Sequence, residues 1–417
     1  MEFTTFGAII GLVIAIILII KKVHPAYSLI LGALIGGLIG GGGLTGTVNT
    51  MISGAQSMMS SVLRILTSGI LAGALIKTGS AEKIADVIVK KLGDKFAIIS
   101  IAVAAMIICA VGVFVDISVI TVAPIAMAIG MKAGYNKPAI LLAMIGGGKA
   151  GNIISPNPNT IATAEAFQTD LTALMLRNII PAIAAVCVTI VLASLLSKKQ
   201  TGDVISSSDI EQTENKQLPS FIAALTGPVV VIILLALRPV CGISIDPLIA
   251  LPLGGIACML ATGHIKSVVA YSEFGLSKVL GVSILLIGTG TLAGIIKASH
   301  LQYDMIALLE MGNLPAFVLA PVSGILMAGA TASTTAGATI ASQTFAQTLL
   351  AHGVPAIDAG AMIHSGSTVI DSLPHGSFFH ATGGSVNMAI KERMKLIPYE
   401  ALVGLTSTIV SILVYLL

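Results

Sequence analysis

Long apolar runs, separated by short polar segments, are the dominant pattern along this chain of 417 residues. A helix needs about 20 mainly apolar residues to cross a bilayer, and many of these runs approach or exceed that length. The pattern predicts spans at about 3–20, 26–40, 60–76, 172–196, 220–237, 247–261, 281–296 and 397–417. We therefore expect an all-α integral membrane protein.

Two other segments each consist of a pair of apolar arms around a turn. The first is 96–131, with Gly112–Asp116 at its turn, and the second is 314–351, with Gly329–Gly337 at its turn. Each arm could span the membrane alone. A turn that carries an aspartate or several threonines nevertheless favours a re-entrant helical hairpin, which dips into the membrane and returns.

Two further apolar segments, 138–168 and 355–392, are interrupted by stretches rich in Gly, Pro and polar residues. The interruptions are Gly146–Thr160 and His364–Ser377. Proline removes a donor and glycine costs about 1 kcal/mol per site, so a helix is not expected to continue there. Non-helical backbone at membrane depth is tolerated only where it is buried in protein or lines a watery cavity. Two broken spans in matching places of two halves indicate the binding site of a secondary transporter.

The two halves of the chain repeat one order of elements around a polar linker. The first repeat is 1–196, the linker is 197–219, and the second repeat is 220–417. Each repeat has five transmembrane helices plus one re-entrant hairpin, with a broken helix near the midplane. An odd number of spans turns the second half over, which predicts inverted-topology repeats.

A short amphipathic segment precedes each hairpin, at 80–93 and at 300–312, and is expected to lie in the membrane interface. A shared motif precedes each of them: Leu71-Ala72-Gly73 with Lys77 in the first half, and Leu292-Ala293-Gly294 with Lys297 in the second. This direct echo supports the repeat.

The distribution of Lys and Arg predicts the orientation, because cytoplasmic loops carry an excess of both. With the N-terminus outside, most of these residues fall on the cytoplasmic side. Only Arg177, Arg238 and Lys297 fall outside, while Arg64 and Lys149 stay within the membrane. Both chain ends are thus predicted to be extracytoplasmic, and the linker 197–219 cytoplasmic.

Composition narrows the function classes further. Hydrophobic residues make up 55% of the chain and charged residues 10%, whereas soluble domains carry about 25% charged residues. The net charge of +3 includes no basic block, so no nucleic-acid partner is expected. The four cysteines show no ligand spacing and no nucleophile motif is present, so we expect neither a metal, nor a cofactor, nor an enzyme. A channel needs a continuous pore with rings of like groups, and a single paired midplane site argues against one.

Placing an ionisable side chain at membrane depth costs free energy, so each such residue is a candidate functional residue. The candidates for carrying a coupling proton are Asp116, Asp371, His364 and His375. Histidine titrates near neutrality, but each His could instead be a neutral hydrogen-bonding group. Asp116 could cap the helix that starts at Ile117, and Lys149 could neutralise a carboxylate such as Asp371.

Small hydroxyl and amide groups surround these charges. With Lys149, the predicted substrate-binding residues are Ser155, Asn157, Asn159, Thr160, Thr331, Ser333, Thr334, Thr335, Ser365, Ser367 and Ser372. Helices that restart near Ile117, Thr160, Thr335 and Ser377 would aim their N-termini at the bilayer centre, and helix N-termini favour anions. The pattern predicts a small organic anion held by hydrogen bonds. Tight helix packing is the alternative explanation of the Gly329–Gly337 stretch.

Four motifs resemble the gluconate permease family of organic-anion:proton symporters, within the ion transporter superfamily. They are Gly146-Gly147-Gly148 leading to Ser155-Pro156-Asn157-Pro158, Phe114-Val115-Asp116 with downstream Pro124, the threonine-rich Ala330–Gly337, and His364-Ser365-Gly366-Ser367 leading to Asp371-Ser372. The resemblance implies a multi-pass protein of a bacterial-type inner membrane, a homodimer, and an elevator-type scaffold with a moving transport part. It also implies proton-driven transport of sugar acids or short hydroxy acids such as gluconate, glycerate or hydroxybutyrate.

Sodium coupling is the main alternative within the transporter class. The carbonyls of broken helices, together with Ser, Thr and Asn side chains, could hold Na⁺ equally well. The substrate would then be a di- or tricarboxylate.

Overall fold

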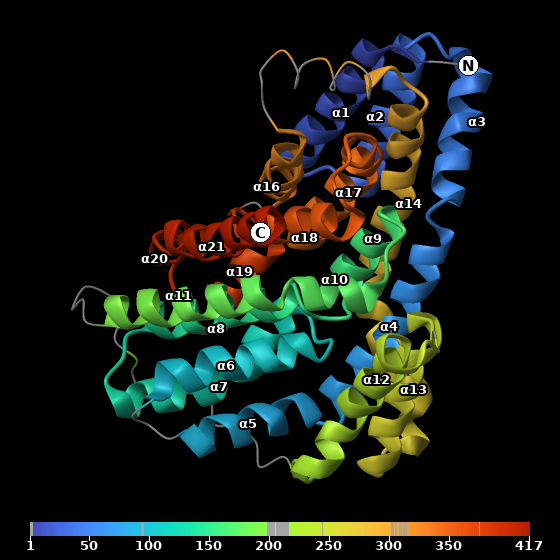
Figure 1. The fold of residues 1–417 in the computed structure, drawn as a ribbon. Helices are drawn as coiled ribbons and strands as arrows, with labels where there is room; N and C mark the ends of the chain where they lie inside the picture. The colour runs from blue at the N-terminus through green and yellow to red at the C-terminus, as the bar shows by residue number, and fades with distance from the viewer. Residues whose placement is uncertain are drawn as a thin grey trace. The chain divides into compact units, whose positions relative to one another are not determined.

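In a computed structural model of the chain, the described residues are 3–92, 96–197, 205, 217–243, 245–301, 304, 307, 311, 315–374 and 376–417. They are mainly helical, as the sequence predicts (Figure 1). The helices are α1 (Thr5–Ile20), α2 (Pro25–Ile39), α3 (Gly43–Gln56), α4 (Met59–Lys77), α5 (Ser80–Leu92), α6 (Ala97–Ala110), α7 (Val115–Ala133), α8 (Lys137–Asn152), α9 (Pro158–Ala166), α10 (Leu171–Arg177), α11 (Ile179–Ser197), α12 (Phe221–Cys241), α13 (Pro247–Ala261), η3 (Ile265–Ser267), α14 (Val268–Lys297), η4 (Ala316–Val318), α16 (Leu319–Thr331), α17 (Thr334–Ala351), α18 (Ala356–Gly366), α19 (Ser377–Gly384), α20 (Ile390–Met394) and α21 (Ile397–Leu416).

Four of these helices differ from the predicted spans. Helix α3 was not predicted, because its run of Gly, Thr, Ser and Asn has little hydropathy. Helix α14 begins at Val268 rather than near 281, and the predicted span 172–196 is divided at Asn178 into α10 and α11. Most of the amphipathic segment 300–312 and of the linker 197–219 lies outside the described residues.

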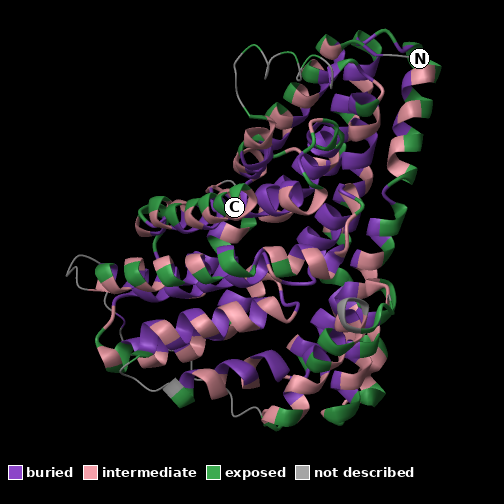
Figure 2. Cartoon of the chain, in the orientation of Figure 1, coloured by how far each residue is buried: buried purple, intermediate pink, exposed green. Residues whose placement is uncertain are grey.

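Both broken spans are present, but the interruptions are shorter than predicted. Helix α8 continues through Gly146–Gly148 and Gly151, and the first break is confined to 153–157. The expectation that these glycines end the helix is wrong. All residues of α8 are buried (Figure 2), so its close packing outweighs the intrinsic cost of glycine. The second break covers 367–376, of which 375 is not described.

The glycines of α8 allow its neighbours to approach closely. A methyl group at Gly147 would meet the carbonyl of Ala102 on α6, and one at Gly151 would meet that of Met106. Gly146 faces Thr189 of α11 in the same way. Helices α6, α7, α8 and α11 therefore lie side by side (Figure 1).

Both predicted pairs of apolar arms are present as two helices joined by a turn, and their re-entrant course in the membrane stays a prediction. Helices α6 and α7 are joined through 111–114, where Gly112 has φ +110°, a conformation that suits glycine. Helices α16 and α17 are joined through Ala332, which has φ +46°, and Ser333. Helix α16 also packs on α18, where Gly324 faces Ile363 and Gly366 faces Pro321.

The chain folds into two compact units that do not coincide with the two sequence halves. Unit 1 consists of Met1–Ile65, Pro158–Arg177 and Leu280–His375, and unit 2 of Leu66–Asn157, Asn178–Val279 and Gly376–Leu417. Each unit contains one hairpin and the first part of one broken helix. The second part of each broken helix belongs to the other unit: α9 packs on α17 and α18, whereas α19 packs on α7 and α8.

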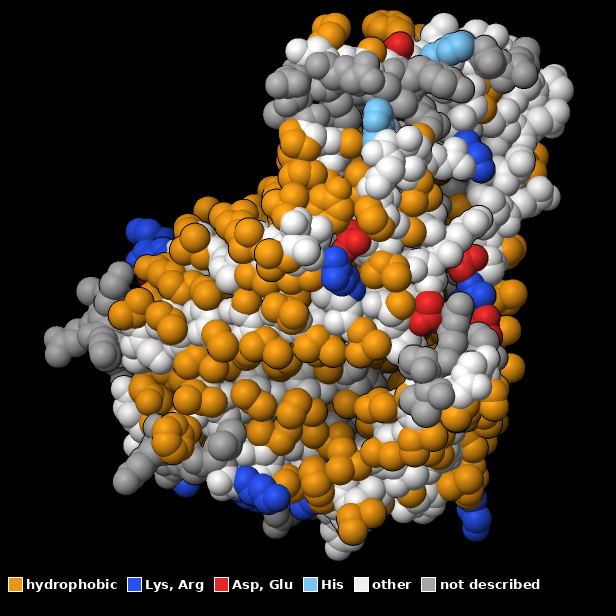
Figure 3. Space-filling view, in the orientation of Figure 1, with side chains coloured by type: hydrophobic (Ala, Val, Ile, Leu, Met, Phe, Trp, Pro, Cys, Tyr) orange, Lys and Arg blue, Asp and Glu red, His pale blue; other side chains and the backbone are white. Residues whose placement is uncertain are grey.

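Apolar side chains are abundant on the surface as well as in the core. Helix α11 exposes Ile179, Ile180, Ile183, Val191 and Leu195, and Figure 3 shows hydrophobic side chains over this helix. Among the described residues, five helical segments are long and apolar enough to cross a membrane, and six shorter apolar helices accompany them. An exposed apolar surface of this kind matches a lipid environment.

Candidate functional site

The second break and the tip of the second hairpin meet at Asp371, whose exposed fraction is 3%. The hydroxyl of Thr334 donates to Oδ2 of Asp371 at 2.5 Å, and the hydroxyl of Ser372 donates to Oδ1 at 2.9 Å. Each carboxylate oxygen therefore accepts a hydroxyl hydrogen bond. Hydrogen bonds to an ionised acceptor are stronger than neutral ones, so the hairpin tip is firmly tied to the break.

A second polar contact lies on the next residue of the hairpin tip. The hydroxyl of Thr335 donates to Oδ1 of Asn159 at 2.5 Å, and Asn159 is the second residue of α9. Asn159 is 4% exposed, and the following Thr160 is fully buried. We call Asn159, Thr334, Thr335, Asp371 and Ser372 the Asp371 cluster. All five belong to unit 1; Asn159, Asp371 and Ser372 are buried, and Thr334 and Thr335 are half-buried.

Two helices begin at the Asp371 cluster. Helix α17 starts at Thr334, with Ser333 as its N-cap: the Ser333 hydroxyl accepts from the backbone N–H of Ala336 at 3.2 Å. Helix α9 starts at Pro158, one residue before Asn159. The first turn of a helix presents free N–H groups and the positive end of the helix dipole. The cluster thus combines a buried carboxylate with two helix N-termini that favour an anion.

Three predicted ligands use their hydroxyl donors within their own helices. Thr331 donates to the carbonyl of Met327 at 2.8 Å, Ser365 to Met362 at 3.2 Å, and Ser367 to Ile363 at 2.8 Å. Such local bonds satisfy carbonyls near a helix end. Their oxygens can still accept a hydrogen bond, so a substrate role for them stays a prediction.

The predicted proton-coupling residues occupy different environments. His364 is fully buried in α18, and neither ring nitrogen has a hydrogen-bond partner within the described part of the chain. Asp116 is half-buried in the first turn of α7, in unit 2, and the N-cap of that helix is Phe114. His375 lies outside the described residues.

The first break is held by amide side chains in unit 2. Asn157 donates from Nδ2 to the carbonyl and the side-chain oxygen of Asn152, at 3.0 and 2.5 Å. Asn178, between α10 and α11, donates to the carbonyl of Ile153 at 3.1 Å. These bonds satisfy backbone groups that the end of α8 leaves open. Ser155 lies fully buried in the same break.

Asn178 was not among the predicted site residues. Its sequence signal is an amide inside the mainly apolar run 172–196, which suggests a buried partner. Of the residues predicted from the first break, only Asn159 and Thr160 belong to the unit that holds Asp371. Lys149, Ser155 and Asn157 belong to unit 2, where Lys149 is 3% exposed in the last turn of α8.

No group of three or more His, Cys, Asp or Glu side chains in the described residues could hold a metal ion. The chemistry of the Asp371 cluster is that of oxygen atoms, namely hydroxyl, amide and carboxylate oxygens. Such a set can exchange a proton, accept hydrogen bonds from a polyhydroxylated solute, or bind a hard cation.

Apolar helices, two helical hairpins and two interrupted helices define a multi-pass membrane transporter. The chain belongs to the GntP permease family, whose model, described as "GntP family permease", matches residues 3–252. It is 53% identical to an uncharacterized transporter of Haemophilus influenzae over 99% of this chain and 98% of that protein.

Other comparisons agree with this class. The Gnt-II system L-idonate transporter of Escherichia coli is 23% identical over 56% of this chain and 54% of that protein. Among solved structures, the Alcanivorax borkumensis YdaH transporter is similar with a TM-score of 0.69 and 14% identity, over 99% of this chain and 98% of the other. Neisseria gonorrhoeae MtrF gives a TM-score of 0.65 and 15% identity, over 88% and 83%. The family and these neighbours are transporters rather than enzymes.

Proposed function

We propose that this permease is a proton-coupled symporter of a small hydroxy-carboxylate such as gluconate, glycerate or hydroxybutyrate. The Asp371 cluster binds the substrate, and Asp371 carries the coupling proton. The observation that supports this most strongly is a buried carboxylate that accepts two hydroxyl hydrogen bonds beside two helix N-termini. One relative is named for L-idonate, a sugar acid, which agrees with this substrate class.

Electrostatics gives the coupling its physical basis. An ionised Asp371 repels an anionic substrate at the same site, and a proton on Asp371 removes that repulsion. Proton and anion therefore favour each other's binding, and this mutual effect is the thermodynamic condition for coupling. The helix N-termini meanwhile favour the substrate carboxylate.

The neighbouring side chains fit both charge states of Asp371. A hydroxyl can donate to a carboxylate and accept from a carboxylic acid, so Thr334 and Ser372 hold the group before and after protonation. Asn159, Thr335 and Thr160 supply further hydrogen bonds for substrate hydroxyls. On sequence grounds the proposed binding set also keeps Lys149, Ser155, Asn157, Thr331, Ser333, Ser365 and Ser367, with His364, His375 and Asp116 as secondary proton sites.

The proposal extends to the assembly and its orientation. Repeats 1–196 and 220–417 are inverted copies, the protein is an elevator-type homodimer of a bacterial inner membrane, and both termini are extracytoplasmic. The matching order of hairpin and broken helix in the two halves supports the repeat.

Uptake into proteoliposomes tests this function. We would compare labelled gluconate, glycerate, 3-hydroxybutyrate, lactate, succinate and citrate, each with an inward proton gradient and separately with an inward sodium gradient at equal pH. Accumulation of a hydroxy-monocarboxylate under the proton gradient alone is expected.

A sodium-coupled di- or tricarboxylate transporter is the second candidate. The oxygen-only Asp371 cluster supports it, because Na⁺ binds carboxylate, hydroxyl and amide oxygens in broken-helix sites. Sodium-dependent accumulation of succinate or citrate in the same assay would select this candidate and overturn proton coupling.

A further inference from the structure

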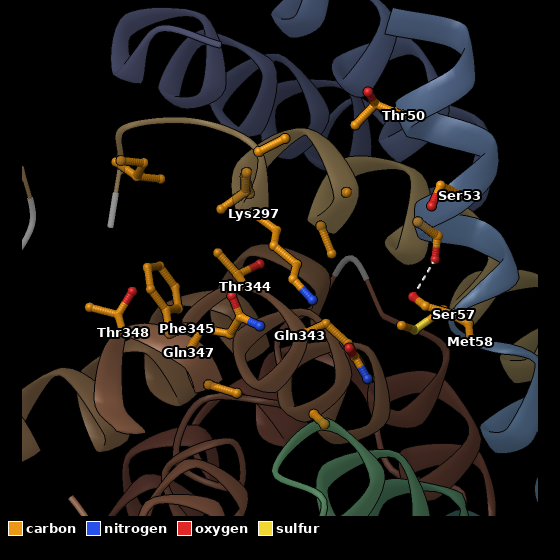
Figure 4. A pocket seen from close by; sticks show the side chains of 18 of the residues that line it. Thr50, Ser53, Ser57, Met58, Lys297, Gln343, Thr344, Phe345, Gln347 and Thr348 are labelled. Atoms are coloured by element: carbon orange, nitrogen blue, oxygen red, sulfur yellow. Dashed lines mark hydrogen bonds between the residues drawn. The ribbon is translucent and has the colours of Figure 1, made fainter. Parts of the chain in front are cut away.

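Unit 1 contains a cavity of about 700 Å³ away from the residues of the Asp371 cluster. Its walls come from α3, the end of α14, the second half of α17, and the end of α9 with the segment that follows it. Figure 4 shows Lys297 extending from α14 toward Gln343 and Thr344 of α17, with Ser53 on α3 and Ser57 directly after it. A cavity lined by a cation, amides and hydroxyls suits a hydroxylated anion.

The charge balance of the cavity favours an anion. Glu165 also lines it, but this carboxylate forms an ion pair with Arg64 and accepts a hydrogen bond from Ser60 at 2.6 Å. Lys297 has no ion pair or hydrogen bond with any residue that the structure describes. The amide nitrogen of Gln343 is buried, and it too lacks a partner among the described residues. A lysine and an amide donor therefore remain available to a ligand.

The corresponding helix crossing in unit 2 provides a comparison inside the molecule. In unit 2, Gly69 and Gly73 of α4 cross Gly275 of α14 in close contact, and Lys77 follows on α4. The Nζ of Lys77 lies 4.2 Å from the ring centre of Phe274, the residue before the crossing glycine. This lysine is exposed, but its ammonium group contacts an aromatic ring.

In unit 1, Gly290 and Gly294 of α14 cross Gly54 of α3 in the same way, and Lys297 follows on α14. The residue before the crossing glycine is here Ser53 rather than a phenylalanine. Ser53 thus has a hydroxyl where unit 2 has the ring of Phe274, and Lys297 faces the cavity (Figure 4).

Helices α9 and α17 connect the cavity to the Asp371 cluster. They pack together, with the Asn159–Thr335 hydrogen bond near their starts and a 3.4 Å bond between Ser342 and Thr163 further along. Thr344 lines the cavity nine residues after Thr335, which corresponds to about 13 Å along a helix. Both polar sites thus lie on one helix pair within unit 1.

We propose that this cavity is a second, weaker binding site for the transported hydroxy-carboxylate. Lys297 binds the carboxylate, and the amides and hydroxyls of α3 and α17 bind the solute hydroxyls. The site captures the anion on the extracytoplasmic side and raises its local concentration before it reaches the Asp371 cluster. The chemical class of the solute rests on the proposed function.

Gluconate uptake kinetics in proteoliposomes test the site. K297Q is expected to raise KM about tenfold, equivalent to about 1.4 kcal/mol, and to leave the maximal rate within about twofold because Lys297 does not contact the Asp371 cluster. K297R should restore most of the affinity. The matched control is K77Q, which removes the lysine that contacts the Phe274 ring in unit 2 and should leave KM unchanged. An unchanged KM in well-folded K297Q would overturn the site.

Direct binding separates this site from the proposed function. With purified protein in phosphatidylcholine nanodiscs, D371N should retain weak binding of labelled gluconate, and D371N/K297Q should lose it. If wild-type protein accumulates only a dicarboxylate, and only with sodium, the proposed function fails. The same variants, tested with that dicarboxylate, still show whether the cavity binds the transported acid. If Lys297 matters only when phosphatidylglycerol is present, a lipid headgroup occupies the cavity and the inference is wrong.

Discussion

Asp371 shows how single hydrogen bonds define the proposed site. The Thr334 hydroxyl reaches it across the hairpin tip, and Ser372 reaches it from the adjacent position. A hydrogen bond to a charged, buried group is worth about 1.5–3 kcal/mol, and loss of the donor leaves the carboxylate oxygen unsatisfied.

We predict that T334V, which keeps the shape but removes the donor, lowers the initial rate of substrate uptake by at least about tenfold. The control is T406V, because Thr406 is half-buried on α21, as Thr334 is on α17, and its hydroxyl bonds within its own helix, to the carbonyl of Leu402. Wild-type uptake by T334V would remove the Thr334–Asp371 contact from the mechanism.

Asn178 supports the first break from outside it. Replacing this fully buried amide by alanine leaves the Ile153 carbonyl without its donor, at a cost of about 1–3 kcal/mol. We predict that N178A lowers the melting temperature of the purified protein. S277A removes an exposed hydroxyl and should not. An unchanged melting temperature for N178A would show that the break does not depend on this bond.

At the residue scale, the sequence could identify the chemistry but not the partners. The residues Asp371, Thr334, Thr335, Asn159 and Ser372 were predicted from polarity at membrane depth, and the structure brings all five together in unit 1. Which hydroxyl bonds which oxygen depends on how distant helices pack, and one-dimensional patterns do not contain that. The role of Asn178 was missed for the same reason.

At the element scale, hydropathy predicted most spans well because a bilayer requires about 20 apolar residues for each crossing. It failed for α3, which is a helix of low hydropathy. It also failed for the glycines of α8, which were assigned to a break although they are helical. Glycine propensity describes an isolated helix, whereas α8 is surrounded by α6, α7 and α11.

The packing of α8 yields a matched pair of substitutions. G147A places a methyl group against the backbone carbonyl of Ala102, which cannot move independently of α6. G281A adds the same methyl group to α14, where nothing lies within 4 Å. We predict a lower melting temperature and less uptake for G147A, and for G281A a neutral effect or a gain of up to about 1 kcal/mol. Equal behaviour of the two variants would contradict the tight α6–α8 contact.

At the scale of the whole molecule, both broken helices carry the chain from one unit to the other. The divisions fall between Asn157 and Pro158, and between His375 and Gly376. Helix α9 follows α8 of unit 2 in the chain, but it packs on α17 in unit 1. Likewise, α19 follows α18 of unit 1 and packs on α7 in unit 2. The sequence predicted the breaks and the paired arms. It did not predict that the two parts of each broken helix belong to different units, because that division depends on long-range contacts.

Orientation can be tested with reporter fusions. The Lys and Arg distribution predicts that alkaline phosphatase, active only outside the cytoplasm, is active when fused after Leu417. A fluorescent protein that matures in the cytoplasm should fluoresce when inserted in the 197–219 linker. The reverse pattern would contradict the predicted orientation and place the Lys297 cavity on the cytoplasmic side.

The variant D371N shows whether Asp371 couples proton movement to anion transport. The amide is isosteric but cannot carry the proton, so the variant should lose uptake driven by a proton gradient while it retains exchange of labelled for unlabelled substrate. D116N, which alters a proposed secondary proton site on the other hairpin, is the comparison and should keep gradient-driven uptake if Asp371 carries the coupling proton. Intact gradient-driven accumulation in D371N would exclude Asp371 as the carrier of the coupling proton. Loss of gradient-driven accumulation in D116N, with exchange preserved, would assign the coupling proton to Asp116.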